Sequence, residues 1–241
     1  MQIKLGMELF EGIFYPVMLP IVHGSCHLLC CGSSGSGKSV ACLYWLNSII
    51  NDVELYICDF KASGDFLGIS DRYAEGKACL ELLERFYGEF QTIKEERQPR
   101  KLLLLFDEYA AFSSWLEGSD KAALKRVQGY ISEILMLGRA LPGGGSSWLW
   151  MSQQRPDAEY FPKGSRLNFH IRICMSSVSR ETKTMLFPDE DIPETYIPSC
   201  GVGLVARDGH PLQEFTVPKV DKEKLRKLLQ HKAASKPGEA R

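Results

Sequence analysis

A glycine-rich stretch near the N-terminus has the residue types and spacing of a phosphate-binding loop. Residues 32–39 read GSSGSGKS and fit the pattern G-x-x-x-x-G-K-[ST]. Glycines in such a loop let backbone N–H groups wrap around phosphates, and the helix that follows directs its positive end at them. Lys38 would neutralise the β- and γ-phosphates, and the Ser39 hydroxyl would bind Mg²⁺. The residues expected to contact a nucleotide are Gly32, Ser33, Ser34, Gly35, Ser36, Gly37, Lys38, Ser39 and Val40.

Two adjacent carboxylates end a second apolar run, LLLLFDE at 102–108. Beside a phosphate loop, Asp107 would hold the metal directly or through its water ligands. Glu108 would orient and deprotonate the attacking water. The alternative is a strand that ends in a solvated acidic turn. The sequence contains no N-K-x-D motif for reading guanine, so ATP is the expected nucleotide.

The elements that must position these residues alternate between strand and helix. An alternation of this kind predicts an α/β fold, in which a mainly parallel sheet carries helices on both faces. The first thirty residues, with Pro and Gly between short extended runs, predict a small β-hairpin that leads into the first core strand. The expected strands are 26–31, 53–58, 102–106, 148–151, 169–174, 202–206 and a last, peripheral one at 213–217; the expected helices are 39–50, 77–97, 121–137 and 221–230.

Composition excludes several classes of protein. The chain has 241 residues, 44% of them hydrophobic and 24% charged, which fits one large globular domain and excludes a disordered or fibrous chain. The formal net charge of −1 means that any contact with nucleic acid must be local. No apolar run reaches the ~20 residues of a membrane span, so this chain is not expected to insert into a bilayer.

The eight cysteines carry no C-x-x-C pair, and most lie within apolar runs. Cys26, His27, Cys30 and Cys31 are close enough in sequence to suggest zinc. However, side chains alternate faces along a strand, so these four would not converge on one ion. Reduced, buried thiols and the lack of a signal peptide instead predict a cytoplasmic location.

Four sequence blocks together resemble the FtsK/SpoIIIE ATPases of the FtsK-HerA superfamily. The blocks are HLLCCGSSGSGKSV at 27–40, YICDFK at 56–61, LLLLFDEYAAF at 102–112 and SQQRPD at 152–157. The stretch from 154 to 173 looks most similar to the TcpA-like coupling ATPases of conjugative elements. The resemblance implies a RecA-like P-loop motor domain at 27–218 that uses ATP and Mg²⁺ and forms a ring, usually a hexamer, to thread DNA.

The resemblance also implies roles for single residues. Gln154 matches the polar sensor of the γ-phosphate or its water. Arg139 matches the arginine finger presented to a neighbour's nucleotide, with Arg155 and Arg172 as competing candidates; its alternative is a cation that ends a helix. Asp59 and Lys61 either belong to the site or pair with each other at a strand end.

For DNA, the family implies pore-facing loops that grip phosphates. The loops expected here are 113–125 and 155–166, whose cations are Lys121, Lys125, Arg126, Lys163 and Arg166. Residues 1–26 would form the lead-in hairpin, and 219–241 a basic, solvated helix with a disordered tail. The sequence departs from the family in its longer PGGGSS turn at 142–147 and in lacking a membrane segment and an orientation-reading domain.

These departures leave three functions open. The chain could move DNA for a conjugative or other mobile element, with membrane or relaxosome proteins as partners. It could drive protein secretion, because type VII secretion ATPases share this fold. It could also be a nucleotide-controlled scaffold that translocates nothing.

Overall fold

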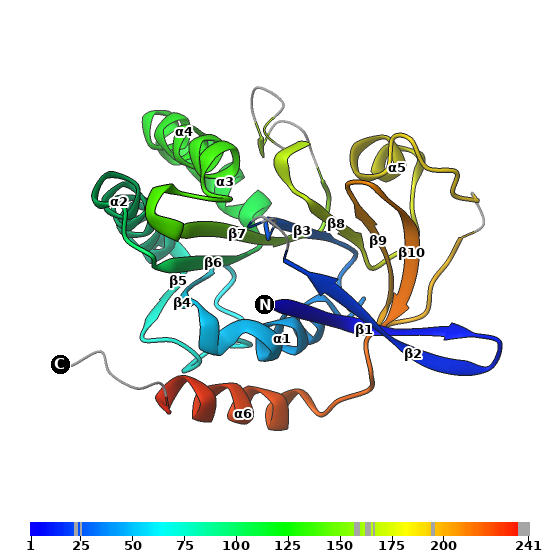
Figure 1. Cartoon of the computed structure of the whole chain (residues 1–241). Helices are drawn as coiled ribbons and strands as arrows, with labels where there is room; N and C mark the ends of the chain where they lie inside the picture. Colours follow the sequence, from blue (N-terminus) through cyan, green and yellow to red (C-terminus); the bar gives the residue numbers. More distant parts are fainter. Residues whose placement is uncertain are drawn as a thin grey trace.

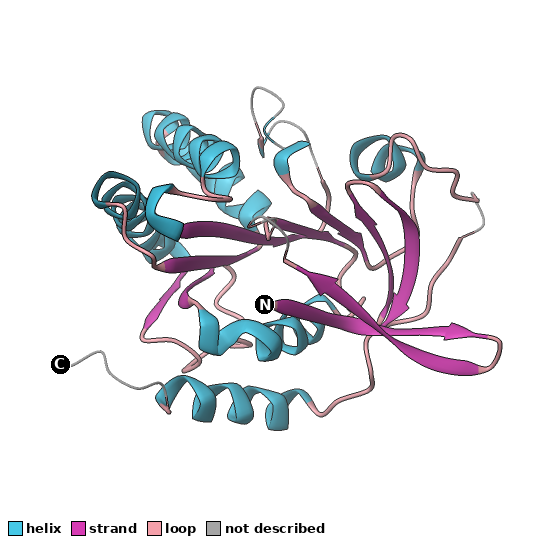
Figure 2. Cartoon of the chain, in the orientation of Figure 1, coloured by secondary structure: helices cyan, strands magenta, loops and turns pink. Residues whose placement is uncertain are grey.

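The computed structural model describes residues 1–21, 24, 26–156, 160–161, 165, 167–193 and 196–235. Within them, ten strands form one sheet in the order β2-β1-β10-β9-β8-β3-β7-β6-β4-β5. Helices cover both faces of this sheet, as Figures 1 and 2 show. The α/β architecture predicted from the alternation of elements is therefore confirmed.

Six neighbouring strands are parallel and make up the core. They are β5 (Arg72–Glu75), β4 (Glu54–Asp59), β6 (Lys101–Asp107), β7 (Ser146–Gln153), β3 (Leu28–Cys31) and β8 (Ile171–Cys174). The inner strands β4, β6, β7 and β3 are buried on both faces, whereas β5, at the edge of the sheet, has no buried residue. Along β6, Leu102 and Leu104 pack into one core cluster while Leu103 and Leu105 pack into the other. The carboxyl ends of all six strands meet at one edge, where parallel α/β sheets bind ligands.

The helices divide between the two faces (Figure 1). α2 (Cys79–Glu96), α3 (Tyr109–Ser119) and α4 (Lys121–Leu137) lie on one face. α1 (Lys38–Ile49) lies on the other, with α6 (Lys222–Ala234) packed outside it. α5 (Arg180–Leu186) follows β8. Three short 3₁₀ segments, η1 (Ile50–Asp52), η2 (Gly76–Ala78) and η3 (Pro142–Gly144), complete the connections. The helix predicted at 121–137 has these bounds in the structure.

Four antiparallel strands extend the sheet beyond β8. They are β9 (Val202–Arg207), β10 (His210–Thr216), β1 (Gln2–Phe10) and β2 (Ile13–Pro20). β1 and β2 form the expected N-terminal hairpin, which projects from the body of the molecule. The last strand was expected to be peripheral, but β10 lies between β9 and β1. The sequence did not reveal this position because the hairpin's partner is more than 200 residues away from it along the chain.

The loop expected at 113–125 is wrong, because most of it is helical. α3 continues to Ser119, and α4 begins at Lys121 after a single residue. Phe112 and Leu116 on α3 are fully buried, which provides the packing energy that holds this helix. Asp120 separates the helices: its N–H donates to Leu116 O (2.7 Å) and its carboxylate accepts the N–H of Ala123 (2.9 Å).

The C-terminal helix α6 is docked on the domain and is not a solvated appendage. Leu225 and Leu229 are buried on its inner side. Lys232 Nζ donates to Asn47 O of α1 at 3.0 Å. The tail beyond Ser235 lies outside the described residues. Among the helices that the structure describes, none is long and apolar enough to cross a bilayer.

Replacing Leu229 with alanine should lower the free energy of unfolding by about 2–5 kcal/mol, the usual cost of deleting a fully buried leucine. Its neighbour Leu228 is 45% exposed and is the matched control, with an expected loss below ~0.5 kcal/mol. Urea denaturation of the two variants measures both. Equal small effects would mean that α6 does not pack on α1 in solution.

Candidate nucleotide site

The phosphate loop joins the carboxyl end of β3 to the start of α1. Gly35 and Gly37 have φ of +79° and +99°, a conformation that turns successive N–H groups inward and that side chains with a Cβ rarely adopt. Gly37 precedes α1 and, among the described residues, no side chain caps this helix, so its first N–H groups face the loop. The predicted setting of strand, loop and helix is present.

Lys38 is buried, and its ammonium bonds to the loop itself. Nζ donates to Gly32 O at 2.6 Å and to Ser33 O at 3.0 Å. The two carbonyls hold the charged end over the hollow of the loop. A triphosphate bound there would offer stronger, charged acceptors at the same place.

Strand register puts the first carboxylate at the same edge as the loop. Asp107 lies opposite Ser152 of β7, and Ser152 lies opposite Cys30 of β3, one residue before β3 ends. The acidic strand β6 is therefore two strands from the loop-bearing strand, with β7 between them. Asp107 and Lys38 are near enough for their charges to interact.

Asp107 is 6% exposed and shares its surroundings with two other acids. Burial raises the pKa of Asp107 to about 6, and the charges of Glu108 and Asp59 act in the same direction. Ser152 and Lys38 oppose the shift. Among the described residues, no three acids, histidines or cysteines are grouped so as to hold a metal ion, so a cation here would depend on Asp107 together with the phosphate loop. Asp107 and the Ser39 hydroxyl supply the hard oxygen ligands that Mg²⁺ prefers, so this donor set fits the metal.

Glu108 has a strained but firmly held backbone. Its φ of +61° is uncommon for a residue with a Cβ. The N–H donates to Ser152 O (2.7 Å), and the carbonyl accepts the N–H of Phe112 (3.2 Å). In the side chain, Oε1 contacts Lys61 Nζ (3.0 Å) and Gln154 Nε2 (3.4 Å).

Gln154 follows β7 and lies between the phosphate loop and Glu108. It lines a hollow with Ser33 and Ser34 of the loop and a second depression with Glu108 and Lys61. The residue before it, Gln153, ties β7 to the loop, because its carbonyl accepts the N–H of Gly32 (3.2 Å). Gln154 is thus brought to the position from which a sensor could reach a γ-phosphate.

Asp59 and Lys61 do not pair with each other. The buried Asp59 carboxylate accepts the N–H and hydroxyl of Ser63 (3.1 and 3.0 Å) and the N–H of Gly64 (2.9 Å). The Tyr73 hydroxyl is a further donor at 3.2 Å. Lys61 turns to Glu108 instead. Of the two alternatives for Asp59 and Lys61, the pairing with each other at a strand end is therefore wrong, because groups of the 59–64 turn already satisfy Asp59.

Arg139 lies at the opposite edge of the sheet from the phosphate loop. It is exposed, it follows α4, and its carbonyl accepts the Ser146 hydroxyl (3.2 Å) at the amino end of β7. Its charge acts on His27, which precedes β3. Arg139 is therefore remote from the nucleotide site of its own chain.

The two competing arginines have different surroundings. Arg155 lines both depressions beside Gln154, within the chain's own site. Arg172 of β8 forms an ion pair with Asp208 at 3.5 Å and is mostly buried. Of the three, only Arg139 is both exposed and far from the local phosphate loop.

The predicted DNA-contacting cations lie on α4 or outside the described part. Lys121, Lys125 and Arg126 are exposed on the first turns of α4, and Arg126 pairs with Glu84 of α2 at 3.5 Å. Lys163 and Arg166 are outside the described residues. The structure thus gives a helical surface where the sequence suggested a loop.

One segment at the site was not predicted from the sequence. Residues 199–201 lie against the phosphate loop, where the N–H of Gly201 donates to Ser36 O (3.1 Å). Cys200, the exposed cysteine, donates to Gly35 O (3.3 Å). Gly201 has φ of +86° and precedes β9, so the glycine just before an apolar run was the only local hint. This segment links the antiparallel part of the sheet to the loop.

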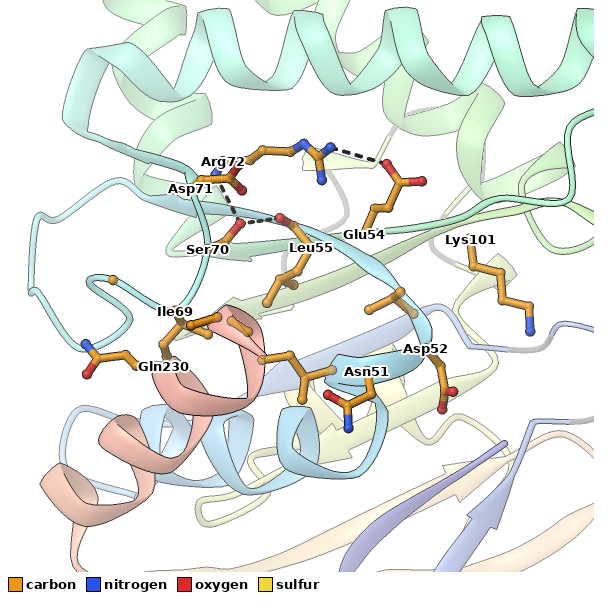
Figure 3. Close-up of a pocket in the computed structure, with 15 residues that line it drawn as sticks. Asn51, Asp52, Glu54, Leu55, Ile69, Ser70, Asp71, Arg72, Lys101 and Gln230 are labelled. Carbon is orange, nitrogen blue, oxygen red and sulfur yellow. Dashed lines mark hydrogen bonds and ion pairs between the residues drawn. The ribbon is translucent and has the colours of Figure 1, made fainter. Parts of the chain in front are cut away.

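One cavity is separate from this site. It encloses about 590 Å³ at the amino ends of β4, β5 and β6, where α6 and η1 close it. Figure 3 shows Arg72 directed at Glu54 across its wall, and their ion pair measures 3.4 Å. Because the phosphate loop lies at the carboxyl ends, this cavity does not take part in nucleotide binding.

Comparisons with known proteins agree with this geometry. No family model matches the chain. A 90-residue stretch is 30% identical to the FtsK domain-containing protein YdcQ of Bacillus subtilis (strain 168), covering 37% of this chain and 17% of that protein. The structure of the pCW3 conjugation coupling protein TcpA, a monomer with ATPγS, superimposes with a TM-score of 0.70 at 21% identity, over 94% of this chain and 70% of that one. This chain shares the fold of the TcpA structure.

Secretion ATPases have the same fold. The cytoplasmic domain of the type VII secretion ATPase EccC of Thermomonospora curvata matches all of this chain, with a TM-score of 0.69 at 21% identity. EssC of Geobacillus thermodenitrificans matches 96% of it, with a TM-score of 0.65 at 12% identity. The chain spans 32% of the EccC structure, 47% of the EssC structure and under a fifth of YdcQ.

Proposed function

We propose that this chain is an FtsK-type ATPase that hydrolyses ATP in a ring, as a hexamer, and uses the energy to move DNA in the cytoplasm. One observation carries the proposal: Lys38, Asp107 and Glu108 converge at the carboxyl edge of the sheet, while Arg139 is exposed at the other edge. Because Arg139 lies away from the site of its own chain, it could serve a nucleotide only at a contact between subunits, which fits hydrolysis in a ring.

The residues divide the chemistry as follows. Lys38 and the N–H groups of the loop bind the phosphates. Ser39 and Asp107 would hold Mg²⁺, and the ion would supply positive charge to the phosphate oxygens. Glu108 accepts a proton from the attacking water, and Gln154 orients that water or the γ-phosphate.

Two exposed apolar side chains support ring assembly. Met136 and Leu137 lie just before Arg139 and are 66% and 48% exposed. Apolar groups at such a place favour coverage by a neighbour, because burial of their surface is favourable. In our proposal a neighbouring subunit covers this face and receives Arg139 at its own nucleotide.

DNA is the favoured cargo. TcpA, a conjugation coupling protein, is similar over nearly all of this chain. Lys121 and Lys125 on α4 offer cations to phosphates without sequence preference. A role in a conjugative or other mobile element, with membrane or relaxosome proteins as partners, follows from the same likeness.

Protein secretion is the second candidate, favoured by the match of EccC over the whole chain. A scaffold without hydrolysis is less well supported, because Glu108 and Gln154 lie together beside the phosphate loop and binding alone needs neither.

The rate of ATP hydrolysis against protein concentration, with and without DNA, tests the proposal. Turnover per subunit should rise with concentration, because the arginine comes from a neighbour, and duplex or single-stranded DNA should raise it further. A rate that neither form of DNA changes would argue for secretion. Turnover per subunit independent of concentration would argue against a shared site.

A further inference from the structure

The PGGGSS turn at 142–147 has no role in the proposed chemistry. It begins shortly after Arg139 in the chain and leads into β7. Glycine leaves the backbone more conformational freedom than any other residue, so three glycines in succession would usually indicate a mobile loop. The contacts of this turn indicate a rigid one.

Two of the three glycines pack tightly against the connection between α2 and β6. A Cβ at Gly143 would overlap the carbonyl oxygen of Arg97. A Cβ at Gly145 would overlap the carbonyl oxygen of Gln98. Only glycine lets two backbones approach each other this closely. The turn therefore rests directly on the end of α2 and needs its glycines for contact as well as for conformation.

Two hydrogen bonds fix the backbone on either side of Arg139. Before it, Gly138 O accepts the N–H of Ser147 (2.8 Å). After it, the N–H of Leu141 donates to Gly145 O (2.9 Å). A backbone that is already held in one conformation loses little entropy when a partner binds to it.

The backbone of Arg139 itself is contacted from two directions. Its carbonyl accepts the hydroxyl of Ser146 at 3.2 Å. A Cβ at Gly24 would overlap the same carbonyl oxygen, so the segment before β3 also packs on it. Both contacts use the backbone, while the residue as a whole is exposed. The structure thus fixes the base of this arginine and leaves its side chain open to a partner.

We propose that residues 138–147, packed on Gly24 and on the end of α2, form a rigid support that fixes where Arg139 enters the nucleotide site of a neighbouring subunit. A misplacement of about 1 Å can cost about 10²-fold in rate, so an arginine that comes from another subunit needs a fixed base. Gly143 and Ser146 are positioning residues that act through Arg139, and their role rests on the proposed function.

Two neighbouring glycines with the same backbone conformation test the support. Gly143 and Gly144 have φ of +83° and +86°, but a Cβ at Gly144 would meet no atom within 4 Å in the part of the chain that the structure describes. We expect Gly143→Ala to lower kcat about 10–10²-fold more than Gly144→Ala does. The affinity for a fluorescent ATP analogue should stay unchanged in both variants. Equal kcat values in the two would overturn the proposal.

A pair of serines provides a milder test, which applies even if Gly143→Ala does not fold. Ser146→Ala removes the hydroxyl that donates to Arg139 O. Ser147→Ala removes a buried hydroxyl that has no partner among the described residues, and it is the matched control. We expect kcat to fall about 2–10-fold for Ser146→Ala alone, the equivalent of one hydrogen bond. An equal fall for Ser147→Ala would mean that the strand end is weakened in general, which contradicts a specific role.

Mixing shows whether the defect acts on the site of a neighbour. A Gly143→Ala subunit keeps its own nucleotide site and can receive Arg139 from a Glu108→Gln subunit. An equal mixture of these two variants should therefore hydrolyse ATP faster than either variant alone. No gain on mixing would place the defect in the variant's own site and would overturn the proposal.

Hydrogen–deuterium exchange tests the support without turnover. The amides of Leu141 and Ser147 should exchange slowly in the wild type and in Gly144→Ala, and at least about 10-fold faster in Gly143→Ala. Fast exchange in the wild type would mean that the turn is mobile and that no support exists. If Arg139→Ala is fully active, or if the wild type hydrolyses no ATP, the proposed function fails, while the exchange rates still decide whether the turn is rigid.

Discussion

Lys38→Ala should lower ATP turnover by at least about 10²-fold, because the ammonium is the charge that the loop holds ready for the β- and γ-phosphates. The ammonium now donates to Gly32 O and Ser33 O. These are neutral carbonyls of the loop, and they cannot supply the positive charge that Lys38→Ala removes. Steady-state hydrolysis measures the loss of turnover, and binding of a fluorescent ATP analogue measures the loss of nucleotide affinity.

The control for Lys38 is an equivalent change away from the site. Lys219→Ala removes an exposed lysine from the connection before α6 and should keep normal turnover. Thermal unfolding must show that Lys38→Ala remains folded. A folded Lys38→Ala protein with wild-type turnover would remove the nucleotide site from this loop.

Arg139→Ala should reduce turnover by about 10³–10⁵-fold, the range measured when an arginine supplied by a neighbour is lost. Glu108→Gln should be similarly inactive, because its own site lacks the base. A mixture of the two variants should regain activity, since an Arg139→Ala subunit keeps Glu108 and can receive the arginine of a Glu108→Gln neighbour. At equal amounts, about a quarter of the interfaces in a randomly mixed ring have this pairing.

The matched mixture uses Arg155→Ala with Glu108→Gln. Arg155 lines the depressions of its own chain's site. In the mixed ring every site therefore lacks either Arg155 or Glu108, and mixing should restore no ATP hydrolysis. Recovery with Arg155→Ala and none with Arg139→Ala would reassign the finger. Full activity of Arg139→Ala alone would remove the role from that residue.

Much of the fold could be predicted because its signals are local. The bounds of the helix at 121–137 follow from apolar residues at helical spacing, and the buried strand at 102–106 follows from an unbroken apolar run. The phosphate loop was found for a related reason: glycines, a lysine and a serine at fixed spacing are required together by phosphate binding. The helix α3 was missed because its short aromatic pattern gains its stability from packing that the sequence does not display.

By itself the sequence determined where the glycine-rich loop lies and which two acids end an apolar strand, and it predicted the roles of Lys38, Ser39, Gln154 and Arg139. Only the tertiary structure decided which groups meet. Strand register places Asp107 at the same edge as the loop, Arg139 lies at the far edge, and Lys61 binds Glu108 rather than Asp59. The physical reason is that spacing along a chain fixes residue types and local periodicity, whereas contacts between residues dozens of positions apart depend on strand order and on which buried polar groups are already satisfied.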